Sequence, residues 1–126
     1  MKKSKKQKSY RFGIAAERYA AIFLFLKGYR ILALRHKNKK GEIDILARRG
    51  KTLVVVEVKA RQNFLNCAES ITPWKQQKIL GAVQWLLAGR AKIAGLNNMT
   101  DLNIRFDVVW VVPWRFPQHL KDAWRL

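Results

Sequence analysis

Cysteine and histidine are scarce in this sequence, and their scarcity excludes two kinds of protein. The single cysteine, Cys67, excludes an internal disulfide and a zinc cluster built from cysteines, and is compatible with a reducing compartment. The two histidines, His36 and His119, do not have the spacing of a metal-ligand motif. We therefore expect neither a disulfide scaffold nor a structural zinc domain.

Long apolar segments are also missing. No stretch approaches the roughly 20 apolar residues that a membrane span needs. Lysines near the N-terminus, followed by an apolar run at 19–26, imitate a secretion signal. However, Glu17 and Arg18 interrupt the approach, Lys27 closes the run, and no small-residue cleavage site follows. We therefore expect a cytoplasmic protein.

Acidic residues are few: the chain has 8 Asp and Glu against 26 Lys and Arg, a formal net charge of +18. Such a charge destabilises the compact state by self-repulsion. A polyanion relieves it, because each neutralised phosphate releases a condensed counterion. The composition therefore favours a nucleic-acid partner. A merely well-solvated surface is one alternative. An anionic membrane surface is another, weakened because the basic residues do not gather on one amphipathic helix.

The 126 residues suffice for one domain with a single core. Residues 1–10 form a lysine-rich arm that should stay disordered until a partner binds, so that the domain covers 11–126. An alanine-rich helical pattern covers 12–27, and Gly28 is placed to end it. A second helix begins with Thr72 as its cap and Pro73 as its first residue, and runs to about Gly89.

Strands are predicted at 29–34, 42–48, 52–60 and 104–112. A basic loop, 35–40, joins the first two, and the tail after 112 is expected to add a short helical turn. The resulting order, α-β-β-β-α-β, predicts an α/β fold: a single layered domain with a mixed central sheet.

Three of the eight acids fall on the polar faces of two neighbouring strands. A tight turn at Arg49-Gly50 pairs Glu42 with Glu57 and sets Asp44 diagonal to Glu57. The predicted faces are Glu42 and Asp44 against Ile43 and Ile45, and Val55, Glu57 and Lys59 against Val54, Val56 and Val58.

Like charges across a strand pair destabilise it, so this acidic cluster needs a neutralising partner. Mg²⁺ suits it, because Mg²⁺ prefers one or two carboxylates together with water and substrate phosphate. Lys59, on the same face as Glu57, is placed to orient or deprotonate a water and to stabilise charge developing on a phosphate. The alternative is an ion-pair ladder with Lys40 on a wet sheet face. A one-residue shift of register would also divide the cluster between the two faces.

The segments GEIDIL at 41–46 and VEVKAR at 56–61 resemble the metal-binding core of the PD-(D/E)XK nuclease superfamily. More closely, the chain resembles the YraN-like family of predicted endonucleases, which are related to archaeal Holliday junction resolvases. GIAAERYA at 13–20, Lys75 and RFDVV at 105–109 also fit, so the resemblance spans about 12–112. Ile43 replaces the proline of the superfamily's name, as is usual in resolvase-like members. The resemblance implies a restriction-endonuclease-like fold.

The resemblance also assigns roles to individual residues. It makes Asp44 and Glu57 metal ligands, with the backbone carbonyl of Val58 as a further ligand, and Lys59 the catalytic lysine. Glu17 matches the first-helix glutamate that completes the metal site or orients a water; the alternative is a solvated helix residue. Glu42 is expected beside the ligands rather than among them, and Asp107 is expected to pair with a nearby arginine for structural reasons.

Several basic and polar residues are candidates for holding the nucleic-acid backbone. The first turn of the second helix carries free N–H groups that favour a phosphate. Trp74 is placed to stack on a splayed base. As single residues they can equally be solvated, so the prediction concerns the group: Lys37, Lys39, Lys40, Arg61, Lys75 and Gln76.

The sequence as a whole therefore predicts a Mg²⁺- or Mn²⁺-dependent endonuclease that hydrolyses phosphodiester bonds in branched or single-stranded DNA. A junction resolvase would need two active sites and hence a homodimer, although the sequence shows no obvious dimer face. Two rivals stay open: a non-catalytic nucleic-acid-binding module with the same basic surface, and a small ribosomal or RNA-chaperone-like basic protein.

Overall fold

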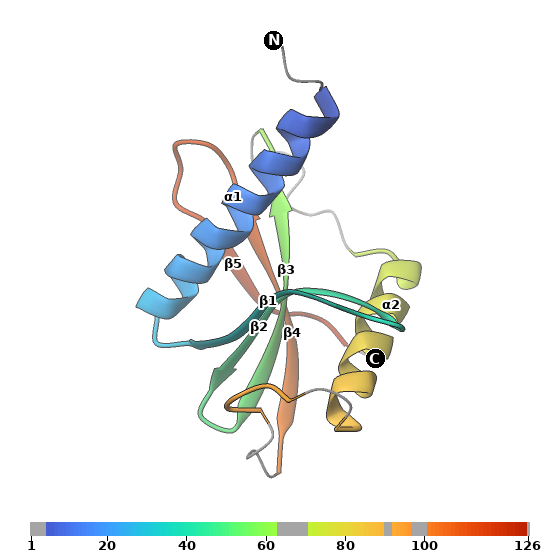
Figure 1. Ribbon diagram of the computed structural model, residues 1–126. Helices are drawn as coiled ribbons and strands as arrows, with labels where there is room; N and C mark the ends of the chain where they lie inside the picture. Colours follow the sequence, from blue (N-terminus) through green and yellow to red (C-terminus); the bar gives the residue numbers. More distant parts are fainter. Residues whose placement is uncertain (1–4, 63–70, 90–91, 97–100, 126) are drawn as a thin grey trace.

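The computed structural model describes residues 5–62, 71–89, 92–96 and 101–125, with side chains from Phe12 onward (Figure 1). Cys67 and the C-terminal Leu126 lie outside these residues. Along the described chain, no helix is both long enough and apolar enough to cross a membrane. The elements are α1 (Lys5–Leu26), β1 (Arg30–Asn38), β2 (Gly41–Arg49), β3 (Thr52–Ala60), α2 (Pro73–Leu87), β4 (Asn103–Val111) and β5 (Gln118–Trp124).

The five strands form one mixed sheet in the order β1-β2-β3-β4-β5. Only β3 and β4 run parallel, and the other neighbours are antiparallel. The helices α1 and α2 lie on opposite faces of this sheet (Figure 1). The predicted α/β layered fold is thus confirmed, and it is compatible with a restriction-endonuclease-like architecture.

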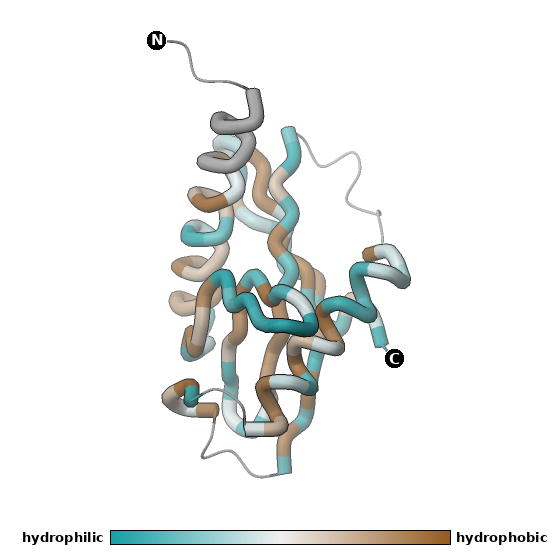
Figure 2. Tube along the Cα trace, turned by 45° about the vertical axis from the view of Figure 1, so that its right-hand side comes forward, coloured by the Kyte–Doolittle hydropathy of each residue, from teal (hydrophilic) through white to brown (hydrophobic). Residues whose placement is uncertain are grey.

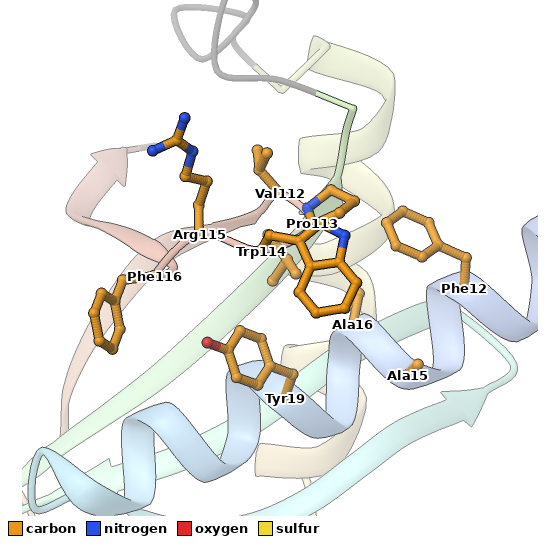
Figure 3. Close-up of a pocket in the computed structure, with 10 residues that line it drawn as sticks. Phe12, Ala15, Ala16, Tyr19, Val112, Pro113, Trp114, Arg115 and Phe116 are labelled. Atoms are coloured by element: carbon orange, nitrogen blue, oxygen red, sulfur yellow. The ribbon is translucent and has the colours of Figure 1, made fainter.

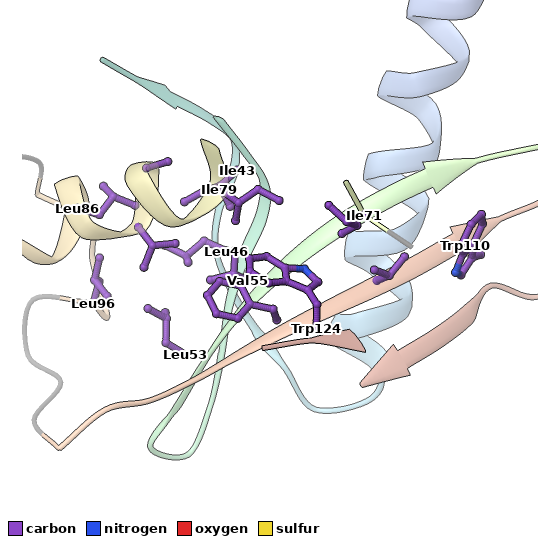
Figure 4. Packing of buried hydrophobic residues seen from close by; sticks show 14 residues of the cluster. Ile43, Leu46, Leu53, Val55, Ile71, Ile79, Leu86, Leu96, Trp110 and Trp124 are labelled. Atoms are coloured by element: carbon purple, nitrogen blue, oxygen red, sulfur yellow. The ribbon is translucent and has the colours of Figure 1, made fainter. Parts of the chain in front are cut away.

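Each helix covers its own apolar cluster. Under α1, the small residues Ala16 and Ala20 let the helix approach Val54 and Val56 of β3 closely. Under α2, a larger cluster unites the helix with the opposite faces of the strands (Figure 4). Apolar segments therefore fill the middle of the molecule, while the turn between β1 and β2 is hydrophilic (Figure 2).

Helix α1 begins at Lys5, seven residues before the predicted start at 12. Lysine and glutamine are good helix formers, and no proline interrupts 5–11, so local propensity lets the helix continue into the arm. Residues 5–10 of the expected arm thus belong to α1, and the disorder of the free arm stays a prediction. The other end is as predicted: Gly28 has φ +96°, which favours glycine, and Tyr29 N–H bonds back to the Leu24 carbonyl at 3.0 Å.

The predicted start of α2 is confirmed. Thr72 Oγ1 accepts a 3.2 Å hydrogen bond from the Lys75 N–H, and Pro73 occupies the first helical position. Two other predictions were wrong. Strand β1 continues to Asn38, so most of the expected loop 35–40 is strand, and the tail forms β5 instead of a helical turn. In both places pairing with a neighbouring strand outweighs the local pattern.

The predicted turn between β2 and β3 was also wrong. Arg49 pairs with Thr52, so the turn residues are Gly50 and Lys51, and every cross-strand pair shifts by two residues. A shift of two keeps side chains on their predicted faces. Ile43 is an exception, because it joins the cluster under α2 whereas Ile45 joins the one under α1. The regular alternation of β2 therefore breaks at Asp44.

Candidate metal and nucleic-acid site

Strands β2 and β3 separate at the break beside Asp44. Their backbone pairing ends at Ile45 and Val56, whereas β3 stays paired with β4 to its last residue. In the fork so formed, the Val58 N–H donates a 2.9 Å hydrogen bond to Oδ2 of Asp44. The hairpin of β1 and β2 swings away toward α2 (Figure 1). In the fork, the Asp44 carboxylate therefore accepts a hydrogen bond from β3 where the neighbouring strand no longer pairs with it.

Asp44 and Glu57 meet in this fork and are hydrogen bonded to each other. Asp44 is 8% exposed and the Glu57 side chain 12%. Burial raises the pKa of Glu57 to about 8, and the charge of Asp44 adds to the rise. Burial also raises the pKa of Asp44, although the Val58 N–H opposes it. The pair therefore holds a proton near neutral pH or favours a cation.

Lys75 is a cation that contacts this pair. Its Nζ lies 3.5 Å from Oε1 of Glu57, and it reaches the fork from the first turn of α2. The sequence placed Lys75 near the substrate backbone but gave no sign of its contact with Glu57. In the structure the lysine both neutralises a buried acid and borders the basic surface described below.

Glu17 approaches the same acids from α1. Burial raises its pKa, and the negative charge of Asp44 is the next cause. Arg35 Nη1 lies 3.4 Å from Oε2 of Glu17, but the contact is not a well-formed hydrogen bond. This oxygen is buried and has no hydrogen-bond partner among the described residues. A buried acceptor of this kind is suited to a water or a cation.

Lys59 follows Glu57 on the same face of β3, as predicted. Its Nζ stands 5.3 Å from the ring centre of Trp110, its register partner on β4. Arg61 also reaches this ring, at 5.9 Å. Trp110 therefore supports two cations next to the acidic fork.

The donor set suits a hard divalent ion, since it consists of carboxylate and carbonyl oxygens. No group of three His, Cys, Asp or Glu side chains fit to hold a metal is found in the described part of the chain. Asp44 and Glu57, with the Val58 carbonyl, would thus form a partial site. Mg²⁺ tolerates such a site, because it retains several waters and shares substrate phosphate oxygens.

A basic groove of about 330 Å³ lies between the β1–β2 turn and α2. The backbones approach so closely here that a β-carbon on Gly41 would collide with the Lys78 carbonyl. Trp74, 69% exposed, contributes an aromatic wall, with Lys78 Nζ 5.5 Å from its ring centre. The structure thus gathers the predicted backbone-binding lysines: Lys37, Lys39, Lys40 and Lys75 all line this groove, together with Glu42.

The remaining predicted residues lie in different settings. Gln76 donates from Nε2 to the Ile71 carbonyl at 3.0 Å and so secures the start of α2. Arg61 donates from Nη1 to the Ala60 carbonyl at 2.9 Å, and lines a cavity on the α1 side of the sheet. Glu42 raises the pKa of both Glu17 and Asp44 through its charge.

Sequence reasoning missed Arg35 and Lys78. Lys78 follows Lys75 by three residues, a spacing that puts both on one helix face, so a search for helical pairs would have found it. Arg35 was assigned to a loop. Its approach to Glu17 depends on the extension of β1, which no local signal indicated.

Asp107 belongs to a separate buried network and is not part of the fork. Arg105 donates to both of its carboxylate oxygens at 2.8 Å, which confirms the predicted arginine partner. His119 adds a 2.7 Å contact, and the Asp122 N–H a 2.9 Å hydrogen bond. Although burial raises the pKa of Asp107, these hydrogen bonds outweigh it and lower the pKa to about 2.

Comparison with known proteins places this arrangement in a family context. The family model described as "Uncharacterised protein family UPF0102" matches residues 16–111. A UPF0102 protein of Parvibaculum lavamentivorans is 48% identical over 93% of this chain and 84% of its own length. A UPF0102 protein of Mesorhizobium japonicum is 44% identical over 94% of this chain and 90% of its own length. A third UPF0102 protein, of Paramagnetospirillum magneticum, is 43% identical over 95% of this chain and 92% of its own length. These names state a family and no activity.

Proposed function

This chain belongs to the uncharacterised protein family UPF0102, the YraN family, and from that premise we propose that it is a metal-dependent endonuclease acting on DNA. Its preferred substrates are branched or single-stranded structures. The observation that best supports this proposal is the fork between β2 and β3. It buries two adjacent carboxyls, Asp44 and Glu57, beside a groove lined by lysines.

Asp44, Glu57 and the Val58 carbonyl would hold Mg²⁺ or Mn²⁺. The ion supplies a Lewis acid that polarises the scissile phosphate and lowers the pKa of the attacking water. Lys59 positions this water and offsets negative charge that develops on the phosphate. Glu17 accepts a hydrogen bond from the same water through Oε2, which has no hydrogen-bond partner among the described residues. Lys75 holds Glu57 in place and adds positive charge where the groove meets the fork.

The test is a cleavage assay with four-way junction, flap, single-stranded and duplex DNA in Mg²⁺, Mn²⁺ or EDTA. We expect metal-dependent cutting that Asp44→Asn and Glu57→Gln reduce at least about 100-fold, since each removes a ligand. Binding to the same DNA should change little. Asp101→Asn is the matched control, because it removes one exposed acid far from β2 and β3 in sequence. Undiminished cutting by a clean Asp44→Asn preparation would end the assignment.

A non-catalytic nucleic-acid-binding module is the second candidate. The ion pair between Lys75 and Glu57 favours it, because an ammonium already balances one of the two carboxylates. This candidate predicts DNA binding without turnover, and no rise in melting temperature with Mn²⁺. Thermal unfolding with and without Mn²⁺ therefore separates the two functions without an activity assay.

A further inference from the structure

A second groove lies on the other face of the sheet, between α1 and the segment that joins β4 to β5. Its volume is about 440 Å³, and four aromatic residues line it: Phe12, Tyr19, Trp114 and Phe116. Figure 3 shows the Trp114 indole facing α1, between Phe12 and Tyr19. Aromatic rings from two distant parts of the chain therefore converge on one groove.

These aromatic residues do not serve the core. Trp114 is 100% exposed and Phe116 is 86% exposed. Single exposed apolar side chains are ordinary on a protein surface, but adjacent large ones mark a binding surface. Trp114 also has an unusual backbone conformation: its φ is +62°, which residues other than glycine rarely adopt, in a turn where the Arg115 N–H bonds to the Val112 carbonyl at 3.2 Å.

The groove continues toward the candidate catalytic fork. A neighbouring cavity of about 430 Å³ shares Phe12 and Ala16 with it and is also lined by Glu17, Val58 and Arg61. Val58 is the residue whose N–H holds Asp44. A chain bound along the aromatic groove would therefore reach the acids from the α1 side.

The charges and aromatic rings that line the groove indicate what kind of molecule binds there. Arg115 is the one charged residue among the described residues that line the groove, and Arg61 lies in the adjoining cavity. A second copy of a chain with net charge +18 would be repelled, whereas a polyanion would be attracted. Bases stack on aromatic rings with little regard to sequence. These features together fit unpaired nucleotides.

We propose that the groove binds a single-stranded segment of the substrate, whose bases stack on Trp114 and Phe116 while Arg115 and Arg61 contact its phosphates. Resting on the proposed endonuclease function, this inference makes the substrate a nucleic acid with an unpaired arm next to the scissile bond. Duplex would contact the lysine-lined groove on the α2 side, and the unpaired arm the aromatic groove on the α1 side.

The experiment measures affinity by fluorescence anisotropy in EDTA, with labelled single-stranded oligothymidylate and blunt duplex. Trp114→Ala should weaken single-strand binding at least about fivefold, the effect of losing one stacked base. Duplex binding should change less than twofold. Trp114→Phe should restore the single-strand affinity, because it retains a ring. Phe25→Ala, which removes an exposed ring of α1 that is not among the lining residues, should change neither.

Three outcomes would overturn the inference. One is unchanged single-strand affinity in a double Trp114→Ala, Phe116→Ala variant. Another is equal loss of single-strand and duplex binding. The third is sedimentation of the wild type as a dimer that Trp114→Ala dissociates, since the groove would then hold a second copy. Because binding is measured without metal, the inference fails or stands separately from the cleavage results with Asp44→Asn.

Discussion

At the scale of single residues, the two buried aspartates of this protein differ in what their surroundings supply. Asp107 receives hydrogen bonds from Arg105, His119 and a backbone N–H, which lower its pKa to about 2 despite burial. Asp44 receives one backbone N–H and faces Glu57, and burial raises its pKa. Asp107 is thus satisfied within the fold, whereas the pair in the fork has too little positive charge around it.

The shortage of positive charge around Glu57 should be measurable in the pH dependence of stability. Its folded pKa of about 8 lies above the ordinary value of 4.5, so the folded state binds the extra proton. That stabilisation is complete below about pH 4.5 and is lost as pH rises through about 8. Without metal, the free energy of unfolding should therefore fall between these values, by at most about 1.4 kcal/mol per pH unit.

Chemical denaturation across this pH range checks the expectation. Glu57→Gln should flatten the slope, because its amide does not titrate. Mn²⁺ should raise the melting temperature of the wild type more at pH 8 than at pH 6, since ion and proton compete for the same oxygens. A slope that Glu57→Gln leaves unchanged would show that another group titrates, and that Glu57 is not the proton-binding acid.

At the scale of helices and strands, local chemistry predicted most boundaries. Thr72, Pro73 and Gly28 each act within a few residues, so the ends they mark could be read from the sequence. The missed strand depends on a partner outside its own segment. β5 forms because β4 pairs with it and Trp124 stacks on Phe106 at 4.0 Å, and nothing within 113–126 indicates that partner.

The candidate site also has a part that local sequence could predict and a part that it could not. The residue types and their spacing on β2 and β3 identified Asp44, Glu57 and Lys59. The fork between these strands was not foreseen, because it arises where the β1–β2 turn packs against α2. The contacts of Lys75 and Arg35 with the acids follow from that arrangement of elements, and not from spacing along the chain.

Gly41 is the point of closest approach between the hairpin and α2, and it gives a test at the scale of elements. A β-carbon there would overlap the Lys78 carbonyl, so Gly41→Ala must push the turn from the helix. We expect a loss of about 1–3 kcal/mol in stability, the usual range for overpacking, together with weaker duplex binding. Thermal denaturation and anisotropy measure the two effects.

Gly13→Ala is the matched control. Gly13 lies within α1, and a β-carbon there meets nothing within 4 Å. The substitution should therefore stabilise the protein by about 0.5–1 kcal/mol, because alanine favours a helix more than glycine does. Were Gly41→Ala as harmless as Gly13→Ala, the tight packing of the turn on α2, and the position of the basic groove, would be incorrect.

At the scale of the whole molecule, the effect of the total positive charge on DNA binding must be distinguished from the effect of where the lysines lie. A net charge of +18 attracts any polyanion, so DNA binding alone says little about the site. The role proposed for the basic groove is narrower. The β1–β2 hairpin brings Lys37, Lys39 and Lys40 beside Lys75, and these lysines would contact phosphates directly. Direct contacts release counterions, and the salt dependence of binding counts them.

Replacing Lys37, Lys39 and Lys40 together by glutamine should therefore make log K less steep in log salt. The expected change is about 0.9 for each phosphate of duplex DNA that the variant no longer neutralises. Replacing the exposed Lys51, Lys92 and Lys121 by glutamine removes the same formal charge from other parts of the chain and should leave the slope nearly unchanged. Titrations of duplex DNA at several salt concentrations measure both variants. Equal slopes for the two triple variants would mean that overall charge, and not the groove, holds the DNA.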